Sequence, residues 1–151
     1  MNKPVSLALD VMSGENDPHS SIEAALKLIS VNESVNLHLI GNEEKIKKCL
    51  PRKIDDRLSI HHSEEVITMN DSPMDVLRRK KQSSMRLAVE LVANKKADAC
   101  ISSGNTGALL AISKYLLKTI PNITRPALAK SIPTIKSFTY MLDLGANSNC
   151  T

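Results

Sequence analysis

Short apolar runs alternate along this sequence with segments of helical periodicity, and this alternation constrains the fold more than any other feature. Apolar composition predicts strands at residues 5–9, 35–40, 58–61, 97–102, 127–131 and 138–144. Helices are predicted between them, and alternating strands and helices indicate an α/β fold with a mainly parallel sheet and right-handed crossovers. The 151 residues fit a single domain, 1–151.

The predicted helices differ in how clearly the sequence marks them. The first begins at a Ser20–Glu23 capping box and carries an apolar stripe that starts at Ile22. A short charged helix is predicted at 43–50, and a long one follows Ser72-Pro73. Residues 105–118 are nearly apolar throughout, which predicts a well-buried helix.

Composition excludes several classes of protein. The three cysteines do not form a disulfide framework, and the four histidines lack zinc-ligand spacing, so we expect no metal site. No apolar run approaches the ~18 residues of a membrane span, and the first is too short for a signal peptide. The chain is therefore predicted to be cytoplasmic. An aromatic content of 2% disfavours a base-stacking surface for nucleic acid.

The net charge of +4 is partly clustered, at residues 78–81 and around 45–53. Such clusters are typical of solvated helix faces, but they also suit an anionic ligand or an acidic partner. A third interpretation is a basic module that binds nucleic acid or an anionic membrane. The lack of aromatic residues and of a strongly amphipathic basic helix weakens it.

All five glycines follow predicted strands, at positions 14, 41, 104, 107 and 145. The carboxyl ends of parallel strands share one edge of the sheet, where open α/β proteins bind ligands. Three of these loops, 10–14, 102–107 and 143–147, also carry polar side chains. We expect them to converge on one site.

The loop 102–107 is the strongest candidate. Gly104 and Gly107 permit close approach of the backbone, and the following helix directs free N–H groups toward a ligand. This chemistry suits a phosphate or the oxyanion of a thioester under attack. A turn with a helix cap uses the same residue types, so that interpretation stays open. The sequence lacks a Walker motif, a Rossmann Gly-x-Gly-x-x-Gly and a Gly-x-Ser-x-Gly elbow.

Other polar residues have two interpretations each. Asp10 and Asp143, at strand ends, could orient a partner, bind a cation or act as bases, or they could cap the next turn. Arg86 and Arg125 could bind an anion or lie on the surface. Cys100 falls inside a predicted strand and is interpreted as a small core residue rather than a nucleophile.

Five motifs in order make the sequence recognisable. It resembles the bacterial phosphate acyltransferase family of phospholipid synthesis at LALDVM (7–12), SSMR (83–86), SGNTGAL (103–109), RPAL (125–128) and LDLGAN (142–147). The resemblance implies transfer of a fatty acyl group from acyl carrier protein to inorganic phosphate, giving acyl phosphate. It implies a three-layer αβα fold like those of isocitrate and isopropylmalate dehydrogenases and phosphate acetyltransferases.

The resemblance also implies partners and residue roles. It indicates a cytoplasmic homodimer with peripheral membrane association, no metal or organic cofactor, and no nucleic acid. Asp10, Asn105 and Asp143 are the expected catalytic residues. The expected substrate-binding residues are Gly14, Ser103, Gly104, Thr106, Gly107, Lys81, Arg86 and Asn147. Lys81 and Arg86 would attract the anion or the acidic carrier protein.

Three departures from the family pattern stand out. Ser13-Gly14-Glu15 replaces Gly-Gly-Asp, which would restrict the backbone if position 13 needs a positive φ. Ser103 stands where alanine is common in the family. The chain corresponds to roughly the first half of a family member, so two alternatives remain: an acyltransferase that needs a second polypeptide, and a truncated, non-catalytic remnant.

Overall fold

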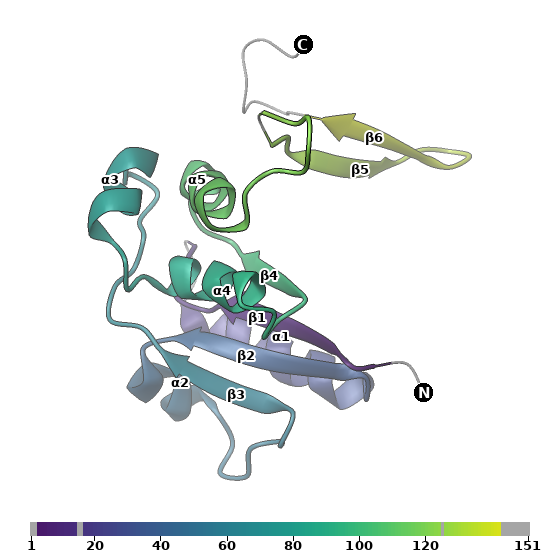
Figure 1. The fold of residues 1–151 in the computed structure, drawn as a ribbon. Coiled ribbons are helices and arrows are strands. Elements are labelled where there is room, and N and C mark those ends of the chain that lie inside the picture. The colour runs from purple at the N-terminus through teal and green to yellow at the C-terminus, as the bar shows by residue number, and fades with distance from the viewer. Residues whose placement is uncertain (1–2, 15–16, 125, 143–151) are drawn as a thin grey trace. The chain divides into compact units, whose positions relative to one another are not determined.

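The computed structural model describes residues 3–14, 17–124 and 126–142, and it divides the chain into two compact units, 1–118 and 119–151. The first unit, shown with the second in Figure 1, is an α/β structure. Its elements are β1 (Val5–Asp10), α1 (Pro18–Val31), β2 (Val35–Gly41), α2 (Glu43–Cys49), β3 (Leu58–His62), α3 (Pro73–Arg79), α4 (Ser84–Ala93), β4 (Ala99–Ser102) and α5 (Thr106–Leu117). The assignment of 1–151 as one domain stays a prediction.

The predicted α/β fold with a mainly parallel sheet is confirmed. Four strands pair in the order β3-β2-β1-β4, and every pairing is parallel. Helices α1 and α2 cover one face and α4 covers the other, which gives three layers (Figure 1). The chain therefore leaves β3 at one edge of this sheet and returns past β2 and β1 to place β4 at the other.

Alternation along β2 explains how both faces become buried. Leu37 and Leu39 point to one face, where they pack with Ile22 and Ile29 of α1. Ile40 points to the opposite face, where it packs with Ala88 and Leu91 of α4. The predicted stripe of the first helix is therefore confirmed: Ile22, Ala25 and Ile29 are its buried residues.

The start of α1 differs from the prediction. The Ser20–Glu23 capping box is wrong, because Asp17 is the N-cap and its side chain accepts a hydrogen bond from the N–H of His19. Pro18 occupies the first turn, which suits a residue that has no N–H to donate. The N-cap therefore lies three residues before the predicted one, and the Ser20 hydroxyl donates to the carbonyl of Asp17.

The long helix predicted after Ser72-Pro73 is two helices, α3 and α4. Residues 80–83 separate them, and tertiary hydrogen bonds hold this break. The N–H of Gln82 donates to the Glu65 carboxylate, and the carbonyl of Gln82 accepts from the Ser63 hydroxyl. Contacts with the segment after β3, invisible in local periodicity, therefore override the helical pattern.

Helix α5 is less buried than predicted. Ala108 and Ile112 are its buried residues in the described chain, while Tyr115 is 55% exposed and Leu117 is 43% exposed. Helix α5 thus has more apolar side chains than the first unit buries. The expectation of a well-buried helix is wrong. No helix within the described ranges is both long and apolar enough to span a membrane.

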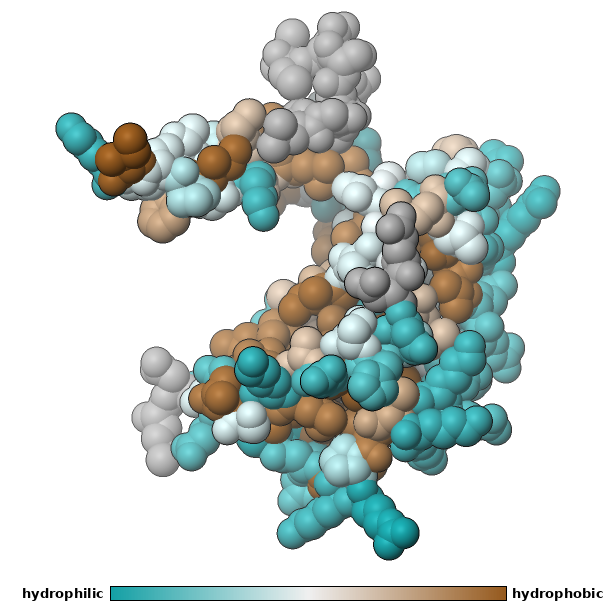
Figure 2. All heavy atoms as spheres, turned by 180° about the vertical axis from the view of Figure 1, so that it is seen from behind, coloured by the Kyte–Doolittle hydropathy of each residue, from teal (hydrophilic) through white to brown (hydrophobic). Residues whose placement is uncertain are grey.

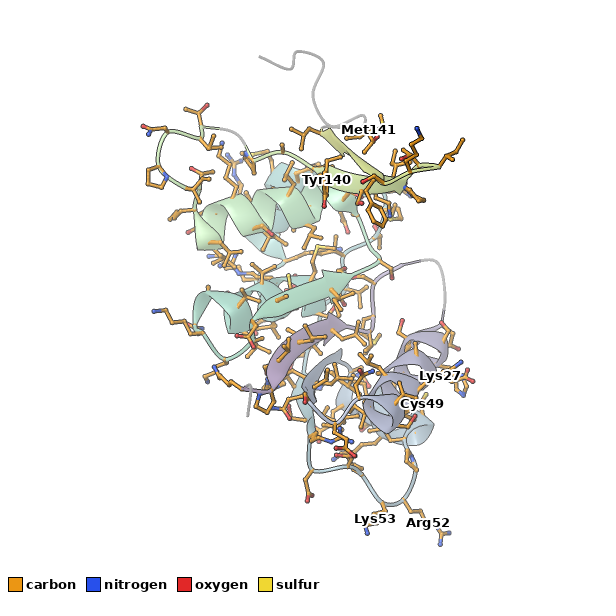
Figure 3. All side chains as sticks on the ribbon, turned by 90° about the vertical axis from the view of Figure 1, so that its right-hand side faces the viewer. Lys27, Cys49, Arg52, Lys53, Tyr140 and Met141 are labelled. Atoms are coloured by element: carbon orange, nitrogen blue, oxygen red, sulfur yellow. The ribbon has the colours of Figure 1, made fainter. Side chains whose placement is uncertain are left out.

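The second unit contains β5 (Ala129–Pro133) and β6 (Phe138–Leu142), which pair antiparallel. Both strands were predicted, but they form a separate two-stranded sheet, because residues 134–137 are too few for a parallel crossover. Tyr140 and Met141 on β6 are labelled in Figure 3. The predicted continuation of this strand to residue 144 lies outside the described residues.

Candidate functional site

The strand order creates a topological switch point between β1 and β4. The loop that leaves β1 leads to α1 on one face of the sheet. The loop that leaves β4 leads to α5, which packs against α4 on the other side. The loops that leave β1 and β4 therefore diverge, and ligands of open α/β sheets bind in the space between such loops. Here these loops are 11–14 and 103–105.

Asp10 joins these two strands at their carboxyl ends. Its side chain is buried, Oδ2 accepts a hydrogen bond from Ser102 Oγ at 2.8 Å, and Oδ1 accepts one from the Met12 N–H at 3.2 Å. Ser102 Oγ in turn accepts from the N–H of Gly104 at 3.3 Å. These bonds tie Asp10 to both loops, and the bond from the Met12 N–H is the turn cap that was one interpretation of this residue. Its expected catalytic role stays a prediction.

The two loops touch closely enough to require glycine. Gly14 has φ +108°, and a Cβ there would lie 2.6 Å from Ser103 Oγ. A Cβ on Gly104 would lie 2.6 Å from Ser13 Cβ. The Ser103 hydroxyl also donates to the Ser13 carbonyl at 2.9 Å. The structure therefore brings together Asp10, Gly14, Ser103 and Gly104, as their positions at strand ends predict.

Ser13 stands where the family pattern has glycine, and its backbone conformation shows whether a glycine is needed there. Lys95, Lys118 and Asn122 are the described non-glycine residues with positive φ, so Ser13 does not strain the backbone in that way. Its Oγ is nevertheless buried without a hydrogen-bond partner among the described residues, as is Ser84 Oγ in the first turn of α4. Each is a polar atom that a ligand or water could satisfy.

Asn105 organises the start of α5. Its Oδ1 accepts from the N–H of Ala108 at 3.0 Å, and its Nδ2 donates to the carbonyls of Thr68, Met69 and Asp71 at 3.3, 3.1 and 3.0 Å. Asn105 thus both caps the helix and holds the 68–71 loop. Its expected catalytic role stays a prediction, and the described contacts are those of a positioning residue.

Thr106 and Gly107 form the exposed first turn of α5. Their N–H groups have no acceptor within the helix, and the positive end of the helix dipole lies there. Because α5 follows β4, this end lies at the carboxyl edge of the sheet.

Two glycines deviate from the expectation that all follow strands: Gly41 is the last residue of β2, and Gly107 lies inside α5.

An ion pair between Asp71 and Lys80 was missed in the sequence. Lys80 Nζ lies 2.6 Å from Asp71 Oδ2 and donates to the Val66 carbonyl at 2.8 Å. The hydrogen bond from Lys80, followed by that from the Thr68 N–H, lowers the pKa of Asp71 below its ordinary value. Nothing in the sequence separates Lys80 from its basic neighbours, since only the tertiary fold places Asp71 beside it.

This lowered pKa predicts a pH-dependent contribution to stability. The ionised carboxylate stabilises the folded chain above the unfolded-state pKa of about 3.9, and the contribution disappears as the pH falls through the folded-state value. Urea unfolding measures the free energy of unfolding of the wild type and of Asp71→Asn. The difference between the two should become smaller as the pH falls from 7 to 3. Asp56→Asn, at an exposed position, is the control. A difference that does not change with pH would contradict a stabilising role of the ionised Asp71 carboxylate.

The predicted cationic residues are not brought into the Asp10–Ser103 cluster by any described contact. Lys81 is exposed between α3 and α4. Arg86 Nε donates to Glu90 at 2.9 Å, and its guanidinium lies 5.6 Å from the centre of the Tyr115 ring. Arg86 is thus engaged in a partly buried ion pair and in a cation–π interaction, so it is not a free anion-binding group. Lys81 and Arg86 as ligand-binding residues stay predictions.

The other basic residues of the two clusters are mostly solvated. Arg79 pairs with Asp75 and Lys47 pairs with Glu43, each one helical turn away. Arg52 and Lys53 extend from the loop after α2 (Figure 3). These contacts agree with the interpretation of the clusters as solvated faces.

Four residues that the sequence singled out fall outside the described part of the chain. Asp143, Asn147 and Arg125 lie outside the described residues, together with Gly145. Within the described ranges, no group of three or more histidine, cysteine or acidic side chains is arranged to hold a metal ion. Cys100 is partly buried in β4, and burial, with a smaller effect of the Asp10 charge, raises the pKa of its thiol. A raised pKa disfavours the thiolate and so agrees with a packing role.

Comparison with known proteins adds the family. The family described as "Fatty acid synthesis protein" matches residues 5–151. The phosphate acyltransferase of Shewanella sediminis is 49% identical over 150 residues, which is 97% of this chain and 44% of that relative. The phosphate acyltransferase of Methylococcus capsulatus is 47% identical over 149 residues, with the same shares, and that of Saccharophagus degradans is 44% identical over 152 residues. The chain thus spans less than half the length of these curated relatives.

The family match begins at Val5 and covers the described switch-point loops, and the relatives are 47% and 49% identical. These two findings together assign the family. The chain belongs to the fatty acid synthesis protein family, and its curated relatives carry the name phosphate acyltransferase.

Proposed function

We propose that this chain supplies the phosphate-binding part of an enzyme that transfers a fatty acyl group from acyl carrier protein to inorganic phosphate. The observation that carries the proposal is the switch point, where Asp10 and Ser102 hold two glycine-containing loops beside the N-terminus of α5. The names of the relatives support the reaction class. Acyl carrier protein as donor and acyl phosphate as product belong to the proposal.

The proposed reaction asks little of the side chains. A phosphate oxygen attacks the thioester carbonyl carbon, a C–O bond forms, the C–S bond breaks, and the sulfur leaves as a thiolate that takes up a proton from solvent. Phosphate is already an anion at neutral pH, so no activated serine or cysteine is needed. What remains is positioning and stabilisation of negative charge, which N–H groups at a helix N-terminus provide.

In this proposal the N–H groups of Thr106 and Gly107 face the phosphate or the developing oxyanion. Asp10 and Asn105 act as positioning residues, because each bonds to the loops rather than projecting an unpaired group. Asp143 and Asn147 would contribute from the third loop. The exposed residues Arg78 and Lys81 are the part of the described chain that we propose for contact with the acidic carrier protein.

The experiment measures acyl phosphate formation from palmitoyl-acyl carrier protein and phosphate. It uses the chain alone and the chain mixed with the part of the Shewanella sediminis relative that this chain does not cover. We expect turnover in the mixture. The absence of turnover in both samples would contradict the proposal. Homodimer formation and peripheral membrane association are proposed for the assembled enzyme and are measured in the same samples by light scattering and vesicle sedimentation.

A proline at position 106 tests the role of the helix N-terminus. Thr106 is the first residue of α5, where proline is tolerated because its missing N–H makes no helical bond. Thr106→Pro should therefore keep the fold but remove one donor, and turnover should fall by about 10²-fold, the usual effect of losing an oxyanion donor. Thr106→Ala removes only the hydroxyl and is the matched control. Equal turnover for the two variants would remove this N–H from the site.

A further inference from the structure

A network of polar side chains crosses three strands on the face of the sheet that α4 covers. It consists of Ser6 of β1, His38 of β2, and Ser59 and His61 of β3, all of them half-buried. In the parallel register His61 lies beside Ile40, which packs against α4. We call this set the His–Ser network. It contrasts with the α1 side of the molecule, where Figure 2 shows apolar side chains gathered at the surface of the first unit.

Hydrogen bonds within the network assign the protons of the two rings. His38 Nε2 lies 2.9 Å from Ser6 Oγ. On the other side of the ring, Nδ1 lies 3.0 Å from His61 Nε2 and 2.7 Å from Ser59 Oγ. The Ser6 hydroxyl donates to the Lys96 carbonyl, so Ser6 Oγ accepts from the N–H at His38 Nε2. His38 Nδ1 is then the acceptor, and the N–H at His61 Nε2 donates to it.

The two rings together can take up one proton without losing their hydrogen bond, but not two. After a first proton, one ring stays neutral and accepts the bond from the charged ring. A second proton leaves no acceptor, because both nitrogens of a charged imidazole are donors. Two N–H groups and two positive charges would then face each other at the 3.0 Å contact between His38 and His61.

The surroundings of the network do not offset a second positive charge. The charged and titratable groups that adjoin it come from α4, from the turn before β4 and from β3: Glu90, Lys96, Asp98 and His62. Glu90 is paired with Arg86, and the Asp98 carboxylate accepts from the N–H of Ser6. Burial, followed by the charges of His38 and Lys96, lowers the pKa of His61 below its ordinary value.

Protons from solvent reach His61 directly. This side chain lines a groove of about 420 Å³ between β3 and α4, which is open to solvent. Three of the adjoining groups, His62, Glu90 and Lys96, line the same groove. The protonation of His61 can therefore follow the pH of the medium while the chain stays folded.

The strand that carries His61 has little else to hold it on this face. Within the described sheet, β3 is an edge strand that pairs with β2 alone (Figure 1). Leu58 anchors its first residue in the core on the opposite face. On the α4 side, the contacts of Ser59 and His61 with His38 join the middle of β3 to β2.

We propose that the His38–His61 pair is a pH-sensitive switch, which keeps β3 on the sheet while at most one ring is protonated and opens this edge when both rings are. The sign follows from proton binding. In the opened strand the rings titrate near their ordinary value of about 6.5, whereas the closed strand resists the second proton. The stabilisation of β3 is therefore complete above about pH 6.5 and is lost as the pH falls through the lowered pKa of His61.

Amide hydrogen exchange of the whole chain tests the switch strand by strand. Protection factors of the β3 amides are compared with those of β1 at pH 7.5 and at pH 5.0, each relative to the intrinsic exchange rate at that pH. His61→Gln places an amide nitrogen where Nε2 donates, and the glutamine does not titrate. His19→Gln, at an exposed position on α1, is the matched control. Circular dichroism at pH 7.5 verifies that both variants fold.

We expect protection of the β3 amides in the wild type and in His19→Gln to fall on the order of tenfold between pH 7.5 and pH 5.0. The β1 amides should lose less, and His61→Gln should keep its β3 protection. If His61→Gln does not fold, His38→Asn carries the same expectation, since its amide oxygen takes the place of Nδ1. An equal loss in the wild type and the variant, an equal loss in β1 and β3, or no loss in the wild type would overturn the switch.

Discussion

Gly104→Ala should destabilise the chain by about 1–3 kcal/mol, the usual cost of forcing extra volume into a packed region. The new Cβ would lie 2.6 Å from Ser13 Cβ and 2.9 Å from Met85 Cε. The methionine end can move, but Ser13 Cβ is fixed to the backbone of the loop after β1. The substitution should therefore push the two switch-point loops apart, and urea unfolding at pH 7 measures its effect on stability.

Gly107→Ala is the matched control for this substitution. Its Cβ would meet Pro73 Cγ at 3.3 Å and Asn105 Oδ1 at 3.4 Å, contacts that need only small adjustments. Because Gly107 lies in α5, alanine also improves helix propensity there, by up to about 1 kcal/mol. We expect this variant to be neutral or slightly stabilised. Similar losses for both variants would show that close contact between the loops does not limit stability.

Asn105→Ala should lower the free energy of unfolding by about 2–3 kcal/mol. Loss of an N-cap costs typically about 1 kcal/mol, and the three carbonyls of Thr68, Met69 and Asp71 lose a shared donor as well. The 68–71 loop should then become more mobile. Hydrogen exchange of its amides, together with urea unfolding, checks both effects.

Asn42→Ala provides the comparison that separates the two contributions. Asn42 caps α2 by accepting from the Lys45 N–H at 3.0 Å, which is the same cap bond without the loop contacts that Asn105 makes. Its loss should be about 1 kcal/mol. The excess for Asn105→Ala then measures the attachment of the 68–71 loop. If the two variants lose the same stability, Asn105 acts only as a helix cap.

Much of the fold could be predicted because it depends on local signals. Apolar runs placed the ends of the four parallel strands to within one or two residues. The stripe at Ile22, Ala25 and Ile29 located the buried face of α1. The antiparallel pairing of β5 and β6 was not predicted. The break between α3 and α4 was also missed, because it depends on Glu65 and Ser63, about twenty residues earlier.

The candidate site shows the same division. Glycines and polar residues at strand ends identified Asp10, Gly14, Ser103 and Gly104, because a close approach of backbones restricts the residue types that fit. The Asp71–Lys80 ion pair and the buried hydroxyls of Ser13 and Ser84 had no such signal. Serine and lysine occur in many surroundings, so their identity alone does not report burial or partners.

The sequence by itself determined the α/β class, the placement of the strands, the family and the loops that carry polar chemistry. These follow from side-chain periodicity and from residue types that only certain backbone geometries accept. Only the tertiary structure decided that β4 pairs with β1, which places Ser102 beside Asp10 although 92 residues separate them. Strand order arises from packing between distant segments, and local sequence does not encode which segments meet.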